Sequence, residues 1–463
     1  MQRTRQAVRV SKPSWWKTAC AVCALCATAT GATASGPTSG DKARTSTTAL
    51  SSLPAEARPG ILSALSRDLR ISQLAELTAS DGSTDDDLAW SVSVNGNTIA
   101  VGTPNASIGS NSAQGAVYVF VKPAGGWTNM TQTAKLTASD GAAGDQLGWS
   151  VSISGNTVVA GAPNATVGGN QHQGAAYVFV EPSGGWVDMT QTAKLTASDG
   201  ASQNSLGFSV SISSITVLAG APGADSLLGA AYVFAKPLGG WANISQQAKL
   251  TAPDSKSGGK LGWPVSVSGV TAVAGAILDG PGQAGAIYVF VKPSNGWHST
   301  TQTAQLDASD GMPDEQLGYP VAINASTVVA GAPYDTTSGP PGSEQGAAYV
   351  FVEPSQGWTA GNQTAKLTAA DGQVGDQLGR SVSLSGTVLS AGAWRANNLE
   401  GTAYLYLKPP GGWQNTSVFN TELSASDGSS GDVFAASMGA GNDVSVAGAP
   451  GHLGVGAAYV FGP

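Results

Sequence analysis

One sequence unit occurs seven times in tandem in this chain, and this repetition excludes most folds. Three short phrases recur in the same order: Ala-Ser-Asp-Gly, Gly-Ala-Pro and Ala-Tyr-Val-Phe, or close variants of them. The units follow one another at about 56 residues, a period typical of propellers and other repeat architectures. The aspartates of the first phrase are Asp81, Asp140, Asp199, Asp254, Asp310, Asp371 and Asp427.

Each unit alternates apolar and polar residues with a period of two, which predicts half-buried β-strands. In the second unit the predicted strands cover residues 150–154, 157–163, 174–180 and 191–197. Short turns rich in Gly, Asn and Pro connect them, so the four strands form one antiparallel propeller blade. Seven units therefore predict an all-β fold, the seven-bladed β-propeller.

The two ends of the array complement each other. The last unit stops after its third strand, whereas residues 73–79 resemble a fourth strand and precede the first unit. An open array would leave exposed sheet edges. We therefore expect the N-terminal strand to complete the seventh blade and close the ring, so that the propeller spans residues 73–463.

The composition fits tight turns and closely approaching strands. The 463 residues include 62 Gly and 24 Pro, and only 11% are charged, but 41% are hydrophobic, which argues against a disordered chain. The Gly and Ala of the second and third strands are expected where neighbouring blades crowd together near the axis. The net charge of −8 disfavours binding to nucleic acid.

The N-terminal segment has the features of a secretory signal peptide at residues 1–34. A basic run precedes an apolar stretch that holds all three cysteines, and Ala-Thr-Ala precedes Ser35. Residues 35–72 are interpreted as a linker with a short helix at 59–69. No second apolar segment is long enough to span a bilayer. These features predict a secreted, extracellular or cell-surface protein with no membrane span after cleavage.

The phrase Leu-Gly-Trp at residues 147–149, followed by Gly-Ala-Pro at 161–163, resembles the FG-GAP repeat. This repeat is the blade motif of the integrin alpha-subunit propeller and of many secreted proteins. The resemblance covers residues 73–463 and implies a seven-bladed propeller that works in binding or cell adhesion. Thr103, Ile277 and Trp394 interrupt the Gly-Ala-Pro phrase in three units.

One departure from the integrin pattern concerns calcium. Integrin-type repeats that bind Ca²⁺ carry an Asp-rich loop between the first and second strands. Here that connection is as short as Gly155-Asn156 and holds no carboxylate. The resemblance therefore does not bring those calcium sites to this chain.

Acidic residues gather instead in the loop before the first strand of each unit. Besides the aspartate of the first phrase, a second position is acidic in five units: Asp86, Asp145, Glu315, Asp376 and Asp432. Carboxylate oxygens are the ligands that Ca²⁺ prefers. The densest cluster is Asp81 with Asp85, Asp86 and Asp87, and it is the predicted metal site, with Ca²⁺ as the cofactor if there is one. The alternative is structural: each first aspartate caps its turn by accepting backbone N–H bonds.

The loop between the second and third strands differs from unit to unit, and in a propeller it emerges on the same face as the acidic loop. Variation on a fixed scaffold is typical of a recognition surface. Tyr334, Trp394 and Arg395 are of the residue types enriched in binding hot spots, and we predict them as ligand-binding residues. For Trp394 the alternative is that it fills the space of the missing Pro. The expected partner is an extracellular protein or glycan, bound by a monomer.

Catalysis is not predicted. The three histidines, His172, His298 and His452, lie in separate units without a recurring acid or serine partner. A Trp that follows Gly before the fourth strand recurs in six units, and such repetition favours packing. The leading hypothesis is a binding or adhesion module. The alternatives are a metal-dependent hydrolase or lyase on a propeller scaffold and a structural envelope protein without a specific ligand.

Overall fold

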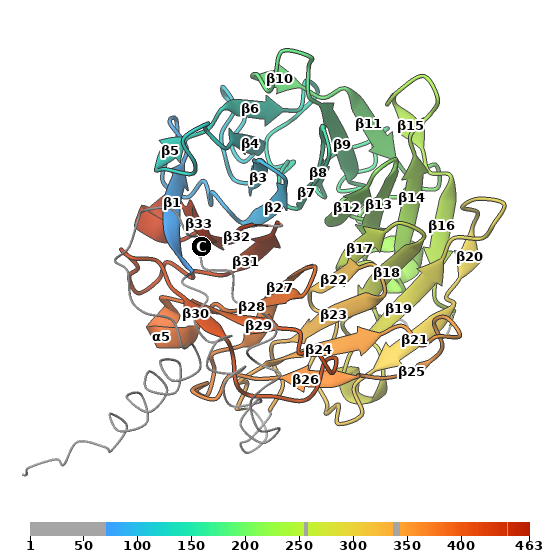
Figure 1. Ribbon diagram of the computed structural model, residues 1–463. Helices are drawn as coiled ribbons and strands as arrows, with labels where there is room; N and C mark the ends of the chain where they lie inside the picture. The colour runs from blue at the N-terminus through green and yellow to red at the C-terminus, as the bar shows by residue number, and fades with distance from the viewer. Residues whose placement is uncertain (1–70, 254–257, 337–342, 442) are drawn as a thin grey trace, which may run out of the picture. The chain divides into compact units, whose positions relative to one another are not determined.

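The computed structural model describes residues 71–253, 258–336, 343–441 and 443–463. These residues form seven small antiparallel sheets arranged as blades around one axis (Figure 1). The prediction of an all-β, seven-bladed β-propeller is confirmed. The predicted signal peptide, and the linker up to residue 70 with its helix, lie outside the described residues.

The first strand of each blade lines the axis, and successive first strands contact one another around a closed circle (Figure 1). These innermost strands are β2 (Ser91–Asn95), β7 (Val151–Ser154), β12 (Ser209–Ser213), β17 (Val265–Ser268), β22 (Val321–Asn324), β27 (Leu378–Ser385) and β31 (Ser437–Ala440). The second strands are β3 (Thr98–Thr103), β8 (Thr157–Ala162), β13 (Thr216–Ala221), β18 (Thr271–Ala276), β23 (Thr327–Ala332), β28 (Val388–Ala393) and β32 (Ser445–Ala449).

The outer half of each blade consists of the third and fourth strands. The third strands are β4 (Ala116–Val121), β9 (Ala175–Val180), β14 (Ala230–Ala235), β19 (Ala286–Val291), β24 (Ala347–Val352), β29 (Thr402–Leu407) and β33 (Ala457–Gly462). The fourth strands are β6 (Ala134–Thr137), β11 (Ala193–Thr196), β16 (Ala248–Thr251), β21 (Ala304–Asp307), β26 (Ala365–Leu367), β30 (Thr421–Leu423) and, from the N-terminus, β1 (Ser72–Thr78).

The ring closes as expected. β1 pairs antiparallel with β33, with Glu76 opposite Tyr459 and Leu77 opposite Ala458, and so supplies the fourth strand of the last blade. Figure 1 shows the two ends of the propeller side by side there.

Short strands that the sequence pattern did not predict link neighbouring blades. Each comes from the connection between the third and fourth strands of one blade and pairs in parallel with the fourth strand of the preceding blade. They are β5 (Met130–Thr131), β10 (Met189–Thr190), β15 (Ile244–Ser245), β20 (Thr300–Thr301) and β25 (Gly361–Asn362). The remaining short elements are the one-turn segments α4 (Ala224–Leu227), α5 (Ala396–Leu399), η1 (Pro281–Gln283) and η2 (His452–Gly454).

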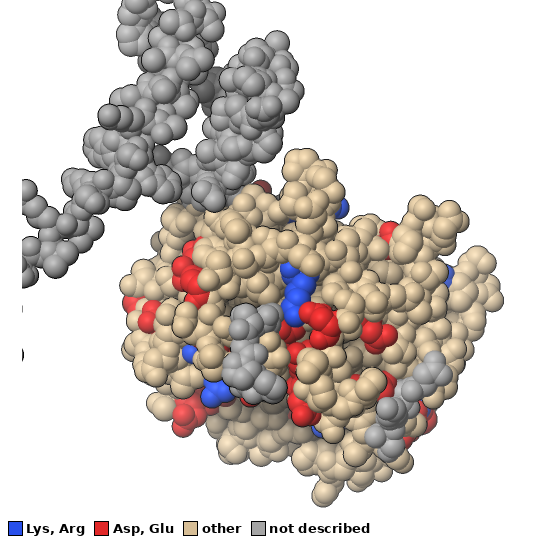
Figure 2. Space-filling model, turned by 90° about the horizontal axis from the view of Figure 1, so that it is seen from below, with Lys and Arg blue, Asp and Glu red and all other residues tan. Residues whose placement is uncertain are grey.

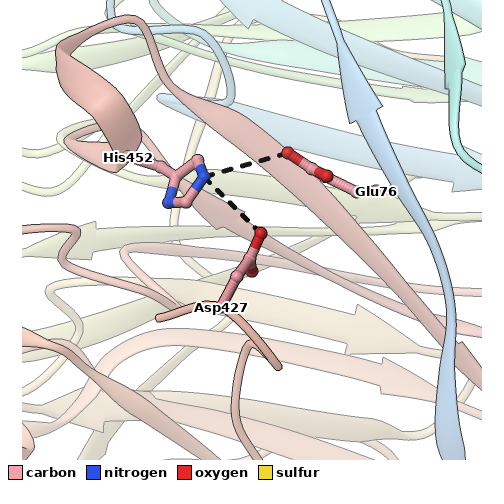
Figure 3. A group of neighbouring side chains, drawn as sticks. All are labelled: Glu76, Asp427 and His452. Atoms are coloured by element: carbon pink, nitrogen blue, oxygen red, sulfur yellow. Dashed lines mark ion pairs between the residues drawn. The ribbon is translucent and has the colours of Figure 1, made fainter. Parts of the chain in front are cut away.

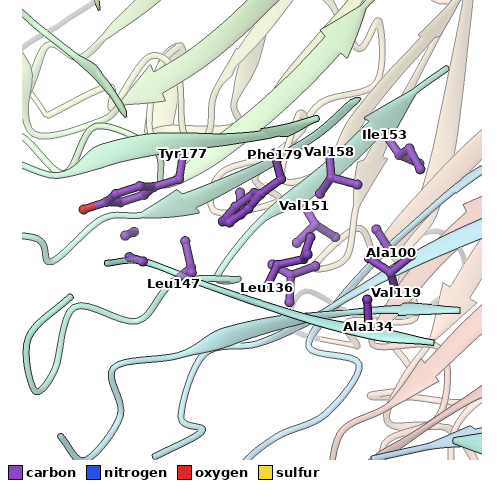
Figure 4. Packing of buried hydrophobic residues seen from close by; sticks show 14 of the residues in the cluster. Ala100, Val119, Ala134, Leu136, Leu147, Val151, Ile153, Val158, Tyr177 and Phe179 are labelled. Carbon is purple, nitrogen blue, oxygen red and sulfur yellow. The ribbon is translucent and has the colours of Figure 1, made fainter. Parts of the chain in front are cut away.

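The apolar core lies between adjacent blades and not inside one blade. In Figure 4, Ala100, Val119 and Leu136 of the first blade pack against Val158 and Phe179 of the second, and all five have no exposed surface. Equivalent clusters recur around the ring. The predicted packing role of the recurring Trp is also confirmed, because the side chains are at most 9% exposed: Trp127, Trp186, Trp241, Trp297, Trp358 and Trp413.

Serine side chains connect the innermost strands across blades. Ser152 Oγ accepts a hydrogen bond from the Ile212 backbone N–H at 3.1 Å, and Ser93 Oγ accepts one from Ile153 at 3.2 Å. Adjacent blades cannot form a continuous sheet at the axis, and the serines pair N–H groups that face the neighbouring blade. The alternating Ser-Val-Ser pattern of the first strand therefore has a specific structural role.

We expect Ser152→Ala to lower the free energy of unfolding by about 1 kcal/mol, because the Ile212 N–H loses its partner in a partly buried position. Equilibrium urea unfolding monitored by Trp fluorescence measures the change. Ser183→Ala, at an exposed turn of the same blade, is the matched control and should be within about 0.5 kcal/mol of the natural protein. Equal effects of the two substitutions would contradict the proposed role of the serine.

Candidate ligand-binding site

One side chain per blade projects at the start of the innermost strand, directly after the Leu-Gly phrase. The preceding glycine, such as Gly148 with φ of +90°, adopts a left-handed conformation that turns the chain into the strand. Five of the seven side chains at this position are aromatic, and the series is Trp90, Trp149, Phe208, Trp263, Tyr319, Arg380 and Ala436. We call the first six of these residues the axial ring.

The aromatic members of the axial ring form a continuous wall. Their neighbouring ring centroids lie 5.0 Å apart for Trp90 and Trp149, 5.5 Å for Trp149 and Phe208, and 4.4 Å for Phe208 and Trp263. Tyr319 follows at 6.4 Å from Trp263. All pairs are tilted, with interplanar angles near 50°, so the wall is concave and not a flat stack.

Arg380 completes the axial ring with a cation. Its guanidinium carbon lies 4.8 Å from the Tyr319 ring centroid and 4.9 Å from that of Trp394. Within the part of the chain that the structure describes, no carboxylate forms an ion pair with Arg380. Its N–H donors are therefore available to a ligand.

The axial ring surrounds a cavity of about 320 Å³ at the axis, to which Trp394 and Pro450 also contribute. Every member of the axial ring is only partly buried. This cavity has the features of a small-ligand site. Such sites have volumes of about 300–1,000 Å³ and a mostly apolar or aromatic lining with a few polar or charged groups.

The three predicted ligand-binding residues are placed differently around this cavity. Trp394 lines it and donates a hydrogen bond from Nε1 to Gln377 Oε1 at 2.8 Å. Tyr334 is half-buried beside the axial ring; burial, and then Tyr319, raise its pKa. Arg395 is exposed at the end of β28. Ligand binding by these three residues stays a prediction, and the structure brings Trp394 directly to the cavity.

Ion pairs that the sequence did not predict hold the first aspartate of the acidic loop in four blades. Lys135 Nζ of the fourth strand lies 2.6 Å from Asp81 Oδ2, and Tyr118 donates a hydrogen bond to Asp81 at 2.9 Å. The same ion pair occurs at Lys194–Asp140, Lys249–Asp199 and Lys366–Asp310. Asp81 and Asp140 also accept a bond from their own backbone N–H, so the turn-cap interpretation of the first aspartate omits the ion pair but is not contradicted.

The second acidic position caps the turn. The Asp145 carboxylate accepts the Ala142 backbone N–H at 2.9 Å, and Asp86, Glu315, Asp376 and Asp432 accept equivalent bonds. These five side chains are at most 9% exposed. The cap requires a carboxylate three residues after the donor, and the residue spacing alone did not distinguish the two aspartates.

The predicted metal residues are described, but they do not converge. Asp81 is held by Lys135 and Tyr118, Asp86 caps Ser83, and Asp87 accepts a bond from Asn105 Nδ2 at 2.7 Å. Burial tends to raise the pKa of Asp81, but the bonds from Lys135 and Tyr118 outweigh it and lower the pKa.

Asp85 lies in the same loop, with a positive φ. No three oxygens of this group, Asp81, Asp85, Asp86 and Asp87, lie within 4.8 Å of one another, and Ca²⁺ binding there stays a prediction.

Charged side chains are sparse on the propeller surface. Figure 2 shows mostly uncharged surface on the face that it presents, with acidic side chains next to basic ones near its middle. The axial ring was not predicted from the sequence. The residue after Leu-Gly, read across the seven units, was the available signal, since it is aromatic in five of them.

Comparison with known proteins gives one family. A family model described as FG-GAP repeat matches residues 71–120, 130–179, 189–234, 244–290, 300–351 and 362–406. No curated protein sequence matches. Among solved structures, the WD40 β-propeller domain of Doa1 aligns over 85% of this chain and 97% of its own length, with 10% identity and a TM-score of 0.49. In the described residues, no helix has the length and apolar character to cross a membrane.

Proposed function

This chain belongs to the FG-GAP repeat family, and we propose that it is a secreted or cell-surface binding module that holds a glycan in the cavity of its axial ring. The family and fold support a binding or adhesion role in general. The axial ring supports the finer proposal, because leaving partly exposed aromatic side chains around one cavity in water costs free energy.

A sugar ring fits this chemistry better than an apolar ligand does. Pyranose rings present a C–H face that packs on aromatic rings, and hydroxyl groups at the edge that accept hydrogen bonds. Trp149 and Trp90 offer tilted faces for contact with the C–H face. The Arg380 guanidinium, which has no ion-pair partner among the described residues, offers donors for the hydroxyl groups. The net charge of −8 favours a neutral glycan over a polyanionic one.

The axial cavity supports binding and not catalysis as the proposed activity. Its described lining includes Arg380 but no Asp, Glu or His side chain that could serve as a general acid or base.

The proposal predicts that Trp149→Ala weakens glycan binding about tenfold, since a stacked aromatic face contributes up to about 1.5 kcal/mol. A glycan array with neutral and sulfated members identifies the ligand, and calorimetry with the best neutral oligosaccharide measures the affinity. Arg380→Ala should also weaken binding, and Arg380→Lys should restore part of it.

Leu238→Ala is the matched control, because Leu238 is a fully exposed apolar residue in a turn between third and fourth strands, away from the axis. It should leave affinity unchanged. An array without hits would reject the glycan proposal, and the structural-protein alternative would then be favoured. Binding that survives Trp149→Ala would place the ligand elsewhere.

A further inference from the structure

The last blade differs from the others where the ring closes. In four blades a lysine of the fourth strand pairs with the first aspartate, as Lys135 does with Asp81. In the last blade Glu76 of β1 holds the lysine position and Asp427 the aspartate position. Two carboxylates therefore face each other where four other blades have an ion pair; in the sixth blade Glu422 and Asp371 hold the same two positions, but without a histidine. Burial, and then Asp427, raise the pKa of Glu76, although His452 lowers it.

His452 is the third member of this cluster. It comes from the loop between β32 and β33, at a position that holds Ala or Asp in the other blades, and only 4% of it is exposed. Its Nε2 lies 3.8 Å from both Glu76 Oε1 and Asp427 Oδ2. Figure 3 shows the three side chains pointing toward one common point. Among the described residues, this is the one group whose three ligand atoms lie within 4.8 Å of one another.

The other histidine nitrogen is fixed. Nδ1 lies 2.8 Å from Asp432 Oδ2, and Asp432 in turn caps Ser429, so the carboxylate accepts the Nδ1 proton. The lone pair of Nε2 is thereby directed at Glu76 and Asp427. A carboxylate that orients a histidine in this way is the usual outer partner of a histidine that binds a metal.

The distances leave room for an ion. At 3.8 Å the Nε2 atom is too far from either carboxylate for a hydrogen bond. Two donor atoms bonded to one tetrahedral Zn²⁺ at about 2.1 Å are roughly 3.4 Å apart, so shifts of a few tenths of an ångström would bring the ligands into place.

Tyr459 lies beside this cluster. Its side chain has no exposed surface, and its hydroxyl, like that of Tyr177 in the second blade, makes no hydrogen bond of regular geometry. It lies opposite Glu76 in the sheet register and edge-on to His452, with ring centroids 5.8 Å apart. Burial, then the charge of Asp427 and a hydrogen bond from the hydroxyl to Asp427, raise the pKa of Tyr459. In three other blades the equivalent tyrosine donates to the first aspartate.

We propose that Glu76, Asp427 and His452 bind one transition-metal ion of the Zn²⁺ class, and that this ion joins the closing strand to the last blade. The imidazole ligand favours Zn²⁺ over Ca²⁺, which prefers oxygen alone. Glu76 is separated from the other two ligands by more than 350 residues in the chain, so the metal would link the two ends of the propeller. Asp427 is half-exposed, which gives the ion a path to the site.

The test uses the full chain, stripped of metal with a chelator and titrated with ZnCl₂ by calorimetry, with elemental analysis of the dialysed protein. We expect one Zn²⁺ per chain and a higher melting temperature, and no such shift with CaCl₂. Glu76→Lys is the decisive variant, because lysine at this position forms an ion pair with the first aspartate in four other blades. It should fold and lose Zn²⁺ binding.

Two further variants separate the ligand role from a structural one. His452→Gln should lose Zn²⁺ binding. Asp432→Asn should weaken Zn²⁺ binding about 10–100-fold, because the His452 imidazole is then no longer held in one orientation. His172→Gln is the control, because His172 is an exposed histidine of the second blade. This variant should still bind one Zn²⁺ per chain. Failure of the natural protein to take up Zn²⁺, or full uptake by folded Glu76→Lys, would overturn the proposal.

Discussion

Replacing Gly161 by Ala is expected to lower the free energy of unfolding by about 3 kcal/mol or more, because the new Cβ would lie 1.8 Å from the Gly207 carbonyl oxygen. Gly161 belongs to β8, and Gly207 directly precedes the axial residue of the next blade. The obstructing atom is backbone, so no side-chain rotation relieves the overlap. The second blade would have to move away from the third.

The same contact recurs at every junction between blades. A Cβ on the glycine of the Gly-Ala-Pro phrase would lie within 2.3 Å of a backbone oxygen in the next blade at all seven positions: Gly102, Gly161, Gly220, Gly275, Gly331, Gly392 and Gly448. The oxygen belongs to the residue after Leu in the Leu-Gly phrase or its variant. The two halves of the repeat motif are therefore the two sides of one blade contact, which accounts for their joint recurrence.

Gly184→Ala is the matched control for this prediction. Gly184 lies in the same blade, has an ordinary φ, and would place its Cβ with nothing within 4 Å. Urea unfolding of both variants, followed by Trp fluorescence and near-UV circular dichroism, gives the comparison. Equal midpoints for the two variants would show that the blades can separate at little cost and would contradict the close-contact interpretation.

The fold was predictable because repetition amplifies a weak signal. A single run such as residues 174–180 is ambiguous by itself, but seven copies in fixed order define strands, blades and the missing fourth strand at once. The short strands such as β10 were not predictable, because Met189–Thr190 has no alternation to detect. They form only when the neighbouring blade presents its edge.

The candidate sites were less predictable because they depend on contacts between blades. Asp81 and Asp86 are both acidic loop residues, and only the position of Lys135 on the adjacent strand decides which one forms an ion pair. His452 seemed isolated in the sequence, since its partner Glu76 lies before the first repeat whereas His452 lies in the last one. Ring closure brings them together, and no local pattern carries that information.

Removal of β1 is expected to have the largest effect on the protein, because this strand supplies the whole fourth strand of the last blade. A chain that begins at Ser80 lacks Ala75 and Leu77, which are 1% and 0% exposed, and leaves β33 with an unpaired edge. Burial of Leu77 alone corresponds to about 2–5 kcal/mol on the scale of Leu→Ala substitutions. We expect the truncated chain to unfold at much lower urea concentration and to associate through the open edge.

A chain that begins at Ile71 is the control, since it keeps β1 and lacks only the preceding residues. Light scattering after size exclusion should show a monomer for this control and larger species for the chain that begins at Ser80. A synthetic peptide of residues 71–80 should pair with the open β33 edge and return the truncated chain to monomers. If the truncated chain is monomeric with an unchanged unfolding midpoint, the last blade is stable with three strands, and closure by β1 is dispensable.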